Sequence, residues 1–251
     1  MPNDLCRMDC SVKLSQNHAV AHLRYQLVTF MSVRPNSYYL LRRVANKNTN
    51  LCVSHQTEMV IEGFPRSANS TTVGEFMQRQ VRPVQVAHHR HHAAQLLRAV
   101  EWNLPAIMLI RDPLEAVVSL LALQAENLKR TGQHPRWPVT AADALQGWVT
   151  FYSAMAGHCE KIVVAPFLEV TRSVSPFIRE VNSRFGTDFV EDDPKFEKVE
   201  TGGWHALPNP IRDALTLDLR ENINQQLKQS YKMRNSLHKA QEIHQSILAH
   251  G

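Results

Sequence analysis

Residues 59–72 read MVIEGFPRSANSTT, an apolar run followed by a loop of small polar residues with one arginine. The run Met59 to Phe64 predicts a β-strand, because it is short, mostly apolar and ends at a Gly-Phe-Pro turn. The residues from Thr72 to Arg82 predict a helix. A strand, a loop and a helix in this order form the first half of a βαβ unit.

The same alternation of short apolar runs and helical patterns continues after residue 82. The expected elements, in chain order, are strand 84–88, helix 92–102, strand 106–110, a helix from 113, a helix from about 140 and strand 161–165. The run 106–110 (AIMLI) is apolar throughout, as expected for a parallel strand covered on both faces. This rhythm predicts an α/β fold with a central, parallel, doubly wound sheet flanked by helices.

Helix start signals support two of these elements. Asp112 is placed to cap a helix, Pro113 suits its first position, and Glu115 could reach back to the cap. Thr140 is followed three residues later by Asp143, which is the spacing of a second cap. We therefore expect helices to begin at these two points.

The segments on either side of this pattern are also expected to be helical. Residues 17–46 predict two helices before the first strand, and the tail from Ile211 predicts largely polar helices. We divide the 251 residues into an N-terminal helical extension, 1–56, and an α/β domain, 57–251, which form one compact unit. With 43% hydrophobic and 20% charged residues, the chain is expected to be globular rather than disordered.

The formal net charge of +5 suits an anionic ligand. The lysines and arginines are scattered, however, and an ordinary solvated surface explains them as well as a nucleic-acid face does. We therefore expect no nucleic-acid partner. Nothing in the sequence predicts an oligomeric state.

The four cysteines predict a reducing compartment. Cys6, Cys10, Cys52 and Cys159 form no CxxC pair and no disulfide framework. No apolar run reaches the length of a bilayer, and the first residues lack the pattern of a signal peptide. We expect a cytoplasmic protein with no membrane partner.

The loop between Phe64 and Thr72 has the composition of an anion-binding turn. Small side chains let backbone N–H groups converge on a ligand, and the N-terminus of the next helix adds partial positive charge. Hydroxyls such as that of Ser70 could donate to phosphate oxygens, and Arg66 could pair with them. A Walker A loop, GxxxxGK[ST], is absent. A Ser/Asn-rich turn that only caps the helix is an alternative of equal weight.

Two segments resemble the nucleotide-binding motifs of the sulfotransferase family, especially its bacterial members. The segment 65–70 (PRSANS) resembles the 5′-phosphosulfate loop, which is written PKSGTTW or PRSGNT. The segment 110–119 (IRDPLEAVVS) resembles the 3′-phosphate motif, in which an Arg at a strand end is followed by a Ser eight residues later; Arg111 and Ser119 have this spacing. The resemblance covers roughly residues 57–190.

The resemblance implies a cytosolic sulfotransferase with a P-loop-like three-layer fold and no metal requirement. Its donor would be 3′-phosphoadenosine 5′-phosphosulfate (PAPS), and its acceptor a hydroxyl or amine of a small molecule or carbohydrate. The residues implied to hold the donor are Arg66, Ser67, Ala68, Asn69, Ser70 and Thr71 at the 5′ end, and Arg111 and Ser119 at the 3′-phosphate. Sulfuryl transfer would be an in-line displacement, in which Arg66 stabilises charge on the leaving phosphate.

The chain departs from the family pattern at several positions. Arg66 replaces the commoner Lys and cannot readily give up a proton. Ala68 replaces Gly, so a left-handed turn there would be strained. Thr71 stands where many members have a Trp that stacks on adenine. The family's C-terminal Gly-rich loop has only weak counterparts, residues 200–204 (ETGGW) and Arg212.

A histidine cluster, HHRHH, ends the second predicted strand. Its members are His88, His89, His91 and His92. A metal site is one alternative, although no Cys, Asp or Glu accompanies the cluster locally; a surface patch without a role is another. The resemblance implies a catalytic histidine at this strand end. Counting back from Leu96 and Leu97 matches this residue to His91, and counting along the strand matches it to His89, so we expect His91 to be the base, with His89 as second choice. An unperturbed imidazole suits this task near neutral pH.

Three other functional classes remain open at this point. A kinase or nucleoside triphosphatase of the same broad fold would need ATP and Mg²⁺, and the absent Walker Lys disfavours it. A non-catalytic relative that kept the nucleotide-binding scaffold is suggested by Ala68 and by the missing C-terminal loop. A basic nucleic-acid binder would show salt-sensitive binding.

Overall fold

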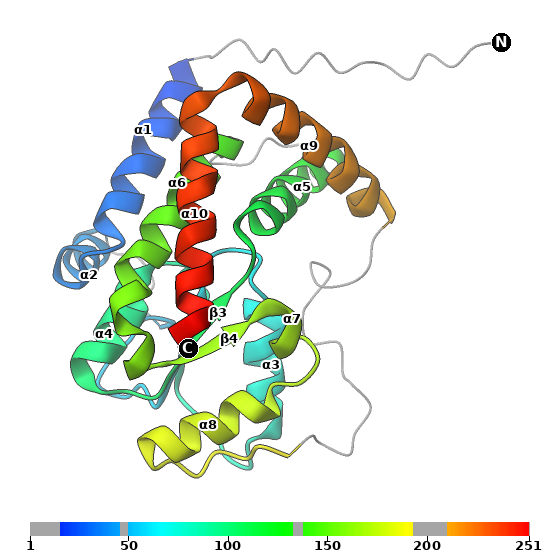
Figure 1. The fold of residues 1–251 in the computed structure, drawn as a ribbon. Helices are drawn as coiled ribbons and strands as arrows, with labels where there is room; N and C mark the ends of the chain where they lie inside the picture. Colours follow the sequence, from blue (N-terminus) through cyan, green and yellow to red (C-terminus); the bar gives the residue numbers. More distant parts are fainter. Residues whose placement is uncertain (1–15, 46–49, 133–137, 193–209, 251) are drawn as a thin grey trace.

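The sheet at the centre of the molecule has four strands, all parallel, in the order β2-β1-β3-β4 (Figure 1). Its strands are β1 (Met59–Gly63), β2 (Val86–His88), β3 (Ala106–Ile110) and β4 (Val163–Pro166). The computed structural model describes residues 16–45, 50–132, 138–192 and 210–250. Because the strands run in one direction, the loops that follow them meet at one edge of the sheet.

The two central strands are apolar because helices cover both of their faces. Every residue of β1 and β3 is buried. Successive side chains point to opposite faces, so that Met59 and Ile61 join one core and Val60 the other. The polar exception is Glu62, whose side chain is fully buried beside the end of β1.

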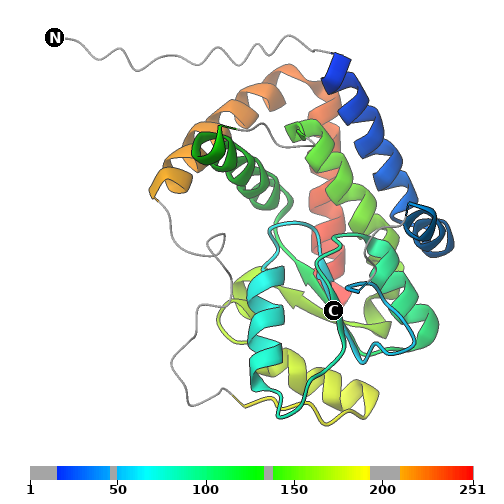
Figure 2. The same ribbon diagram turned by 180° about the vertical axis from the view of Figure 1, so that it is seen from behind.

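Helices on both faces make the sheet the middle of three layers (Figures 1 and 2). One face packs against α3 (Asn69–Arg79) and α8 (Ser175–Phe185). The other face packs against α4 (Ala93–Trp102), α5 (Pro113–Thr131), α6 (Ala141–Met155) and α10 (Tyr231–His250). The helix α9 (Pro210–Gln229) lies along α5, and the short α7 (Phe167–Val170) follows β4. The predicted α/β fold with a central parallel sheet is confirmed.

Two further helices precede the sheet, as the sequence predicted for residues 17–46. They are α1 (Gln16–Met31), which packs against α6, and α2 (Pro35–Val44), which packs against α4. Both lie at one edge of the molecule, at the left in Figure 1. Their inner sides are closed by buried residues such as Ala21 and Tyr38.

The predicted helix starts are confirmed at two points. Asp112 accepts a hydrogen bond from the N–H of Glu115, with Pro113 at the first position of α5. Thr140 and Asp143 form a reciprocal capping box at the start of α6. The Glu115 carboxylate does not reach back to the cap; it pairs instead with Arg220 of α9, at 2.6 Å.

Three elements begin two or three residues away from the predicted start. The helix α3 begins at Asn69, three residues early, because the turn that precedes it is complete at Ala68. The strand β2 begins only at Val86, where it pairs with Met59 of β1. A 3₁₀ helix, η1 (Ala156–Lys161), occupies the predicted start of the last strand. In each case the pairing or turn geometry, and not the local apolar run, sets the boundary.

None of the helices in the described ranges is long and apolar enough to span a membrane.

Candidate functional site

A cavity of about 550 Å³ opens where the loops after the parallel strands meet. Its lining residues are Pro65, Arg66, Ala68, Asn69, Ser70, Thr71, His89, His91, Arg111, Leu120, Leu123, Phe167, Thr171 and Arg212. Eight of the ten site residues expected from the sequence are among them; Ser67 and Ser119 are not. The structure thus brings together residues from the loops after β1, β2 and β3.

The loop after β1 turns through two residues in the left-handed conformation, Arg66 with φ 73° and Ala68 with φ 71°. Neither is a glycine, and this conformation costs a residue with a Cβ about 1 kcal/mol. The strained turn expected at Ala68 is therefore present. Ala68 stands at the N-cap of α3 and has no side chain that could cap the helix. The first N–H groups of a helix have no intrahelical acceptors, and those of α3 receive no side-chain cap from Ala68 either. A helix end of this kind can bind an anion.

Ser67 supports the loop from the inner side. Its side chain is fully buried, and its hydroxyl lies 3.5 Å from the hydroxyl of Tyr152. The Tyr152 hydroxyl donates to the carbonyl of Leu109 at 2.6 Å and accepts the N–H of Phe64 at 3.2 Å. Tyr152 therefore joins the start of the loop to β3. Ser67 helps to shape the loop but does not reach the cavity.

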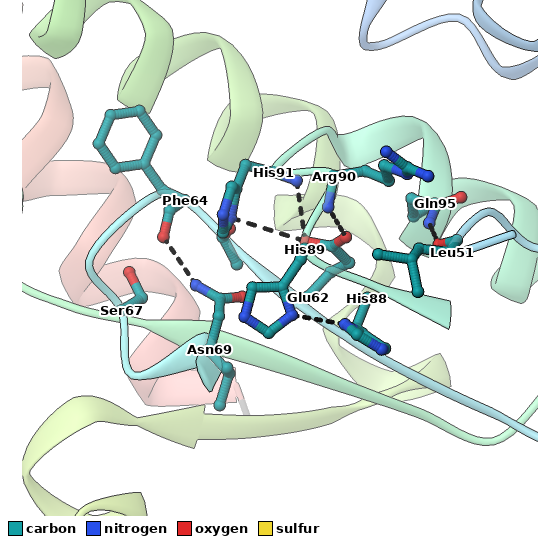
Figure 3. Close-up of polar contacts among 12 residues, drawn as sticks. Leu51, Glu62, Phe64, Ser67, Asn69, His88, His89, Arg90, His91 and Gln95 are labelled. Atoms are coloured by element: carbon teal, nitrogen blue, oxygen red, sulfur yellow. Dashed lines mark hydrogen bonds and ion pairs between the residues drawn. The ribbon is translucent and has the colours of Figure 1, made fainter. Parts of the chain in front are cut away.

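The start of α3 carries two polar atoms with spare hydrogen-bonding capacity. The amide nitrogen of Asn69 donates to the carbonyl of Phe64 at 3.2 Å (Figure 3). Asn69 Oδ1 and Thr72 Oγ1 are buried and have no hydrogen-bond partner within the described ranges. A buried polar atom without a partner costs about 1–3 kcal/mol. Such atoms beside an anion-binding turn are typical of a functional site.

Three guanidinium groups converge on the cavity. Arg111 donates to the carbonyl of Arg66 at 3.0 Å and lies 4.1 Å from the centre of the Phe167 ring. The Nε of Arg66 donates to Ser119 Oγ at 3.0 Å, so the structure pairs Ser119 with Arg66 rather than with Arg111. Arg212, on α9, is buried and pairs with Glu126 at 2.6 Å.

Burial, together with the charges of Arg212 and Arg111, lowers the pKa of Arg66 to about 10. Burial also lowers the pKa of Arg111. The charge of Glu126 raises the pKa of Arg66 and so opposes this shift. The cavity therefore has an excess of positive charge, and an anion bound there would stabilise these cations.

His91 is held in an orientation that suits a proton acceptor. Its Nδ1 lies 3.1 Å from the carbonyl of Gly63, and because a carbonyl can only accept, Nδ1 must carry the proton. Nε2 therefore presents a lone pair. Burial lowers the pKa of His91 to about 4, while the bond to Gly63 opposes this shift. The side chain keeps 30% of its surface exposed, at the cavity that it lines.

His89 is more constrained than His91. Its Nε2 lies 2.8 Å from Ser70 Oγ. Its Nδ1 makes a hydrogen bond with Nδ1 of His88, as Figure 3 shows. Both ring nitrogens are thus engaged by neighbouring side chains. Burial lowers the pKa of His89 as well. Between the two expected candidates, the geometry favours His91 as the base.

Glu62 is a functional residue that the sequence analysis missed. Its carboxylate accepts the backbone N–H of Arg90 at 2.6 Å and that of His91 at 3.0 Å (Figure 3). His89 and His91 both have φ 55°, so this loop is held in two left-handed turns. Burial raises the pKa of Glu62 to about 8, against the effect of its hydrogen bonds. The lone acidic residue in the run MVIEGF was the signal that could have identified it.

Replacement of Glu62 by Gln is expected to loosen the histidine loop. Above about pH 8 Glu62 is mainly the ionised carboxylate and accepts both N–H groups. An amide can accept one of them but turns its own NH₂ toward the other, and one unsatisfied buried N–H costs about 1–3 kcal/mol, so the two proteins are compared above pH 8. The free energy of unfolding of the Glu62→Gln variant should fall by this amount in urea denaturation. Glu101→Gln, at an acid 48% exposed, is the matched control and should change stability by less than about 0.5 kcal/mol. Equal losses in both variants would contradict the assignment.

The pH dependence of stability tests the same group. Because the pKa of Glu62 is about 8 in the folded chain and lower when unfolded, the folded state binds this proton more tightly. The free energy of unfolding should therefore decrease as pH rises from about 4.5 to about 8, and level off above pH 8. The Glu62→Gln variant should lack this decrease.

The remaining residues singled out in the sequence lie outside the cavity or outside the described ranges. Residues 200–204, the weak candidates for a nucleotide loop, lie outside the described residues, as do Cys6 and Cys10. Cys52 and Cys159 are free thiols and are buried. Within the described ranges, no group of three or more His, Cys, Asp or Glu side chains is arranged to hold a metal ion.

No protein-family model matches the chain, and no curated protein shows significant similarity to it.

Proposed function

We propose that this chain is a sulfotransferase, with the P-loop-like fold of that family, that transfers a sulfuryl group from PAPS to a hydroxyl or amine of a small-molecule or carbohydrate acceptor. One observation carries the proposal: Arg66, Arg111 and His91, which come from the loops after three different strands, line a single cavity. The resemblance of segments 65–70 and 110–119 to the two sulfotransferase motifs supports this donor over ATP.

The residues of the cavity fit a ligand with two anionic groups. Arg66 and Arg111 lie side by side and, with Arg212, leave the cavity with excess positive charge. The uncapped N-terminus of α3 adds N–H donors beside Arg66. Arg66, Ser70 and this helix end would hold the 5′-phosphosulfate. Arg111 would hold the 3′-phosphate. Ser119 would act indirectly, because its hydroxyl accepts a hydrogen bond from Arg66 and so fixes the Arg66 guanidinium.

PAPS would supply an activated sulfuryl group, whose transfer passes through a loose transition state with charge on the leaving phosphate. Arg66 and the N–H groups of α3 would stabilise that charge. His91 would accept the acceptor's proton at Nε2, because Gly63 holds the proton on Nδ1. The imidazolium formed would face Glu62, whose carboxylate lies 3.9 Å from Nδ1. These roles are positioning, charge stabilisation and proton transfer.

Calorimetry with adenosine 3′,5′-bisphosphate and adenosine 5′-monophosphate tests the proposal. The second phosphate should gain at least two charge-assisted hydrogen bonds in a partly buried site, so the bisphosphate should bind about tenfold to a hundredfold more tightly. Equal affinities would contradict a PAPS site.

The rival functions give different results in the same experiments. A kinase or nucleoside triphosphatase would prefer ATP and require Mg²⁺. A non-catalytic relative would bind the bisphosphate but transfer no label from radiolabelled PAPS to any member of a panel of phenols, alcohols, amines and sugars.

A further inference from the structure

The helices α1 and α2 expose several large apolar side chains. They are Val20, Leu23, Leu27 and Phe30 on α1, and Leu40, Leu41 and Val44 on α2. The exposed fractions of these residues range from 42% to 75%. On α1 they recur every three or four residues and therefore share one face of the helix, away from the buried Ala21. We call these seven residues the α1–α2 apolar face.

The same part of the chain is basic and contains no acidic residue. Between Asp9 and Glu58 there is no Asp or Glu. The Lys and Arg residues of this interval are Lys13, Arg24, Arg34, Arg42, Arg43 and Lys47. Because the whole chain carries only +5, the remainder of it is close to neutral. The Arg34 guanidinium lies 3.8 Å from the centre of the Phe30 ring, so cationic and apolar groups adjoin on this surface.

This charge distribution disfavours a second copy of the chain as the partner. A face-to-face pair would bring arginines of α1 and α2 against arginines, with no carboxylate of either helix to separate them, and like charges across an interface oppose association. A partner with negative charge is complementary.

The shape of the surface favours a membrane over an acidic peptide. A groove of about 980 Å³ runs beside α1 and takes in Leu23, Leu27 and Phe30, but none of the apolar residues of α2. A peptide helix in this groove would leave α2 uncovered. A lipid surface needs no matching groove, and helices with exposed apolar residues and arginines insert into the boundary between headgroups and acyl chains.

We propose that the α1–α2 apolar face docks this protein on a membrane surface rich in anionic phospholipid. The apolar side chains enter the headgroup boundary, while the arginines pair with lipid phosphates. The sequence-based expectation of no membrane partner considered only segments that span a bilayer; this contact is peripheral. It is independent of the proposed transfer activity.

Sedimentation of the full chain with vesicles tests the proposal. Binding to vesicles enriched in phosphatidylglycerol should exceed binding to phosphatidylcholine alone about tenfold or more, and added salt should weaken it. The double variants Leu23→Gln/Leu27→Gln and Arg24→Gln/Arg43→Gln should each reduce the partition coefficient about tenfold.

Matched controls lie on exposed sites elsewhere. Val81→Gln/Leu217→Gln removes two exposed apolar side chains, and Lys129→Gln/Arg130→Gln removes two exposed cations. Both should bind vesicles like the wild-type protein, and thermal melts check that all four variants fold. Equal binding to both vesicle types, or equal losses in variants and controls, overturns the proposal. The proposal is also overturned if the wild-type protein binds no vesicles but forms a dimer, and if the Leu23→Gln/Leu27→Gln variant is a monomer.

Discussion

In the Arg111→Ala variant, adenosine 3′,5′-bisphosphate is expected to bind about a hundredfold more weakly than in the wild-type protein. The half-buried guanidinium, stacked on Phe167, is the group that we assign to the 3′-phosphate. Its loss leaves that phosphate without its charge-assisted hydrogen bonds. The affinity for adenosine 5′-monophosphate, which lacks this phosphate, should fall by less than about fivefold. Calorimetry measures both affinities.

The comparison of the two nucleotides separates recognition from loop support. Arg111 also donates a hydrogen bond to the carbonyl of Arg66. If its role were only to support this loop, Arg111→Ala would weaken the binding of both nucleotides equally. The Arg111→Lys variant keeps a positive charge but lacks the paired N–H groups of a guanidinium. Its affinity for the bisphosphate should therefore lie between those of the wild type and Arg111→Ala. Arg179→Ala, at a surface arginine paired with Glu191, is the matched control and should leave both affinities unchanged.

Replacement of His91 by Ala is expected to reduce sulfuryl transfer about a hundredfold to ten-thousandfold, the usual contribution of a general base. Binding of the bisphosphate should change by less than about threefold, because the imidazole accepts the acceptor's proton rather than holding the nucleotide. Transfer of label from radiolabelled PAPS to an active acceptor measures the first quantity, and calorimetry the second.

The pH profile identifies the group that titrates. Because burial lowers the pKa of His91 to about 4, the base is neutral through most of the accessible range. The value of kcat/KM should therefore be flat near neutrality and fall below about pH 5. His238→Ala, an exposed histidine on α10, should leave the rate unchanged. A larger loss in His89→Ala than in His91→Ala would transfer the role to His89.

The fold was largely readable from local signals. The strand 106–110 was predicted at both ends, because five apolar residues lie between a turn and the Arg-Asp-Pro that opens the next helix. The caps at Asp112 and Thr140 act over three residues and were equally visible. These features depend on neighbours in the sequence. Eight of the ten expected site residues also share one cavity, because each motif follows a parallel strand.

The remaining features depend on contacts between distant residues. Glu62 reaches a loop 28 residues away, and Ser119 bonds Arg66 across 53 residues. The lone acid in an apolar strand marks Glu62, but nothing in the sequence indicates its partner, and the pairing of Ser119 with Arg66 leaves no periodic or compositional trace. The hydrogen bond between His91 Nδ1 and the Gly63 carbonyl, which sets the tautomer of His91, likewise depends on backbone angles that the sequence does not reveal.

The Tyr152 hydroxyl has a consequence for how the protein matures. It bridges Phe64 and Leu109, so the loop after β1 gains its support only when α6 has docked. A ribosome-bound chain that ends before residue 140 would already contain every residue assigned to the donor. It would nevertheless lack the phenol that supports their arrangement, so the proposed nucleotide site would form only after a later part of the chain has been synthesised and packed.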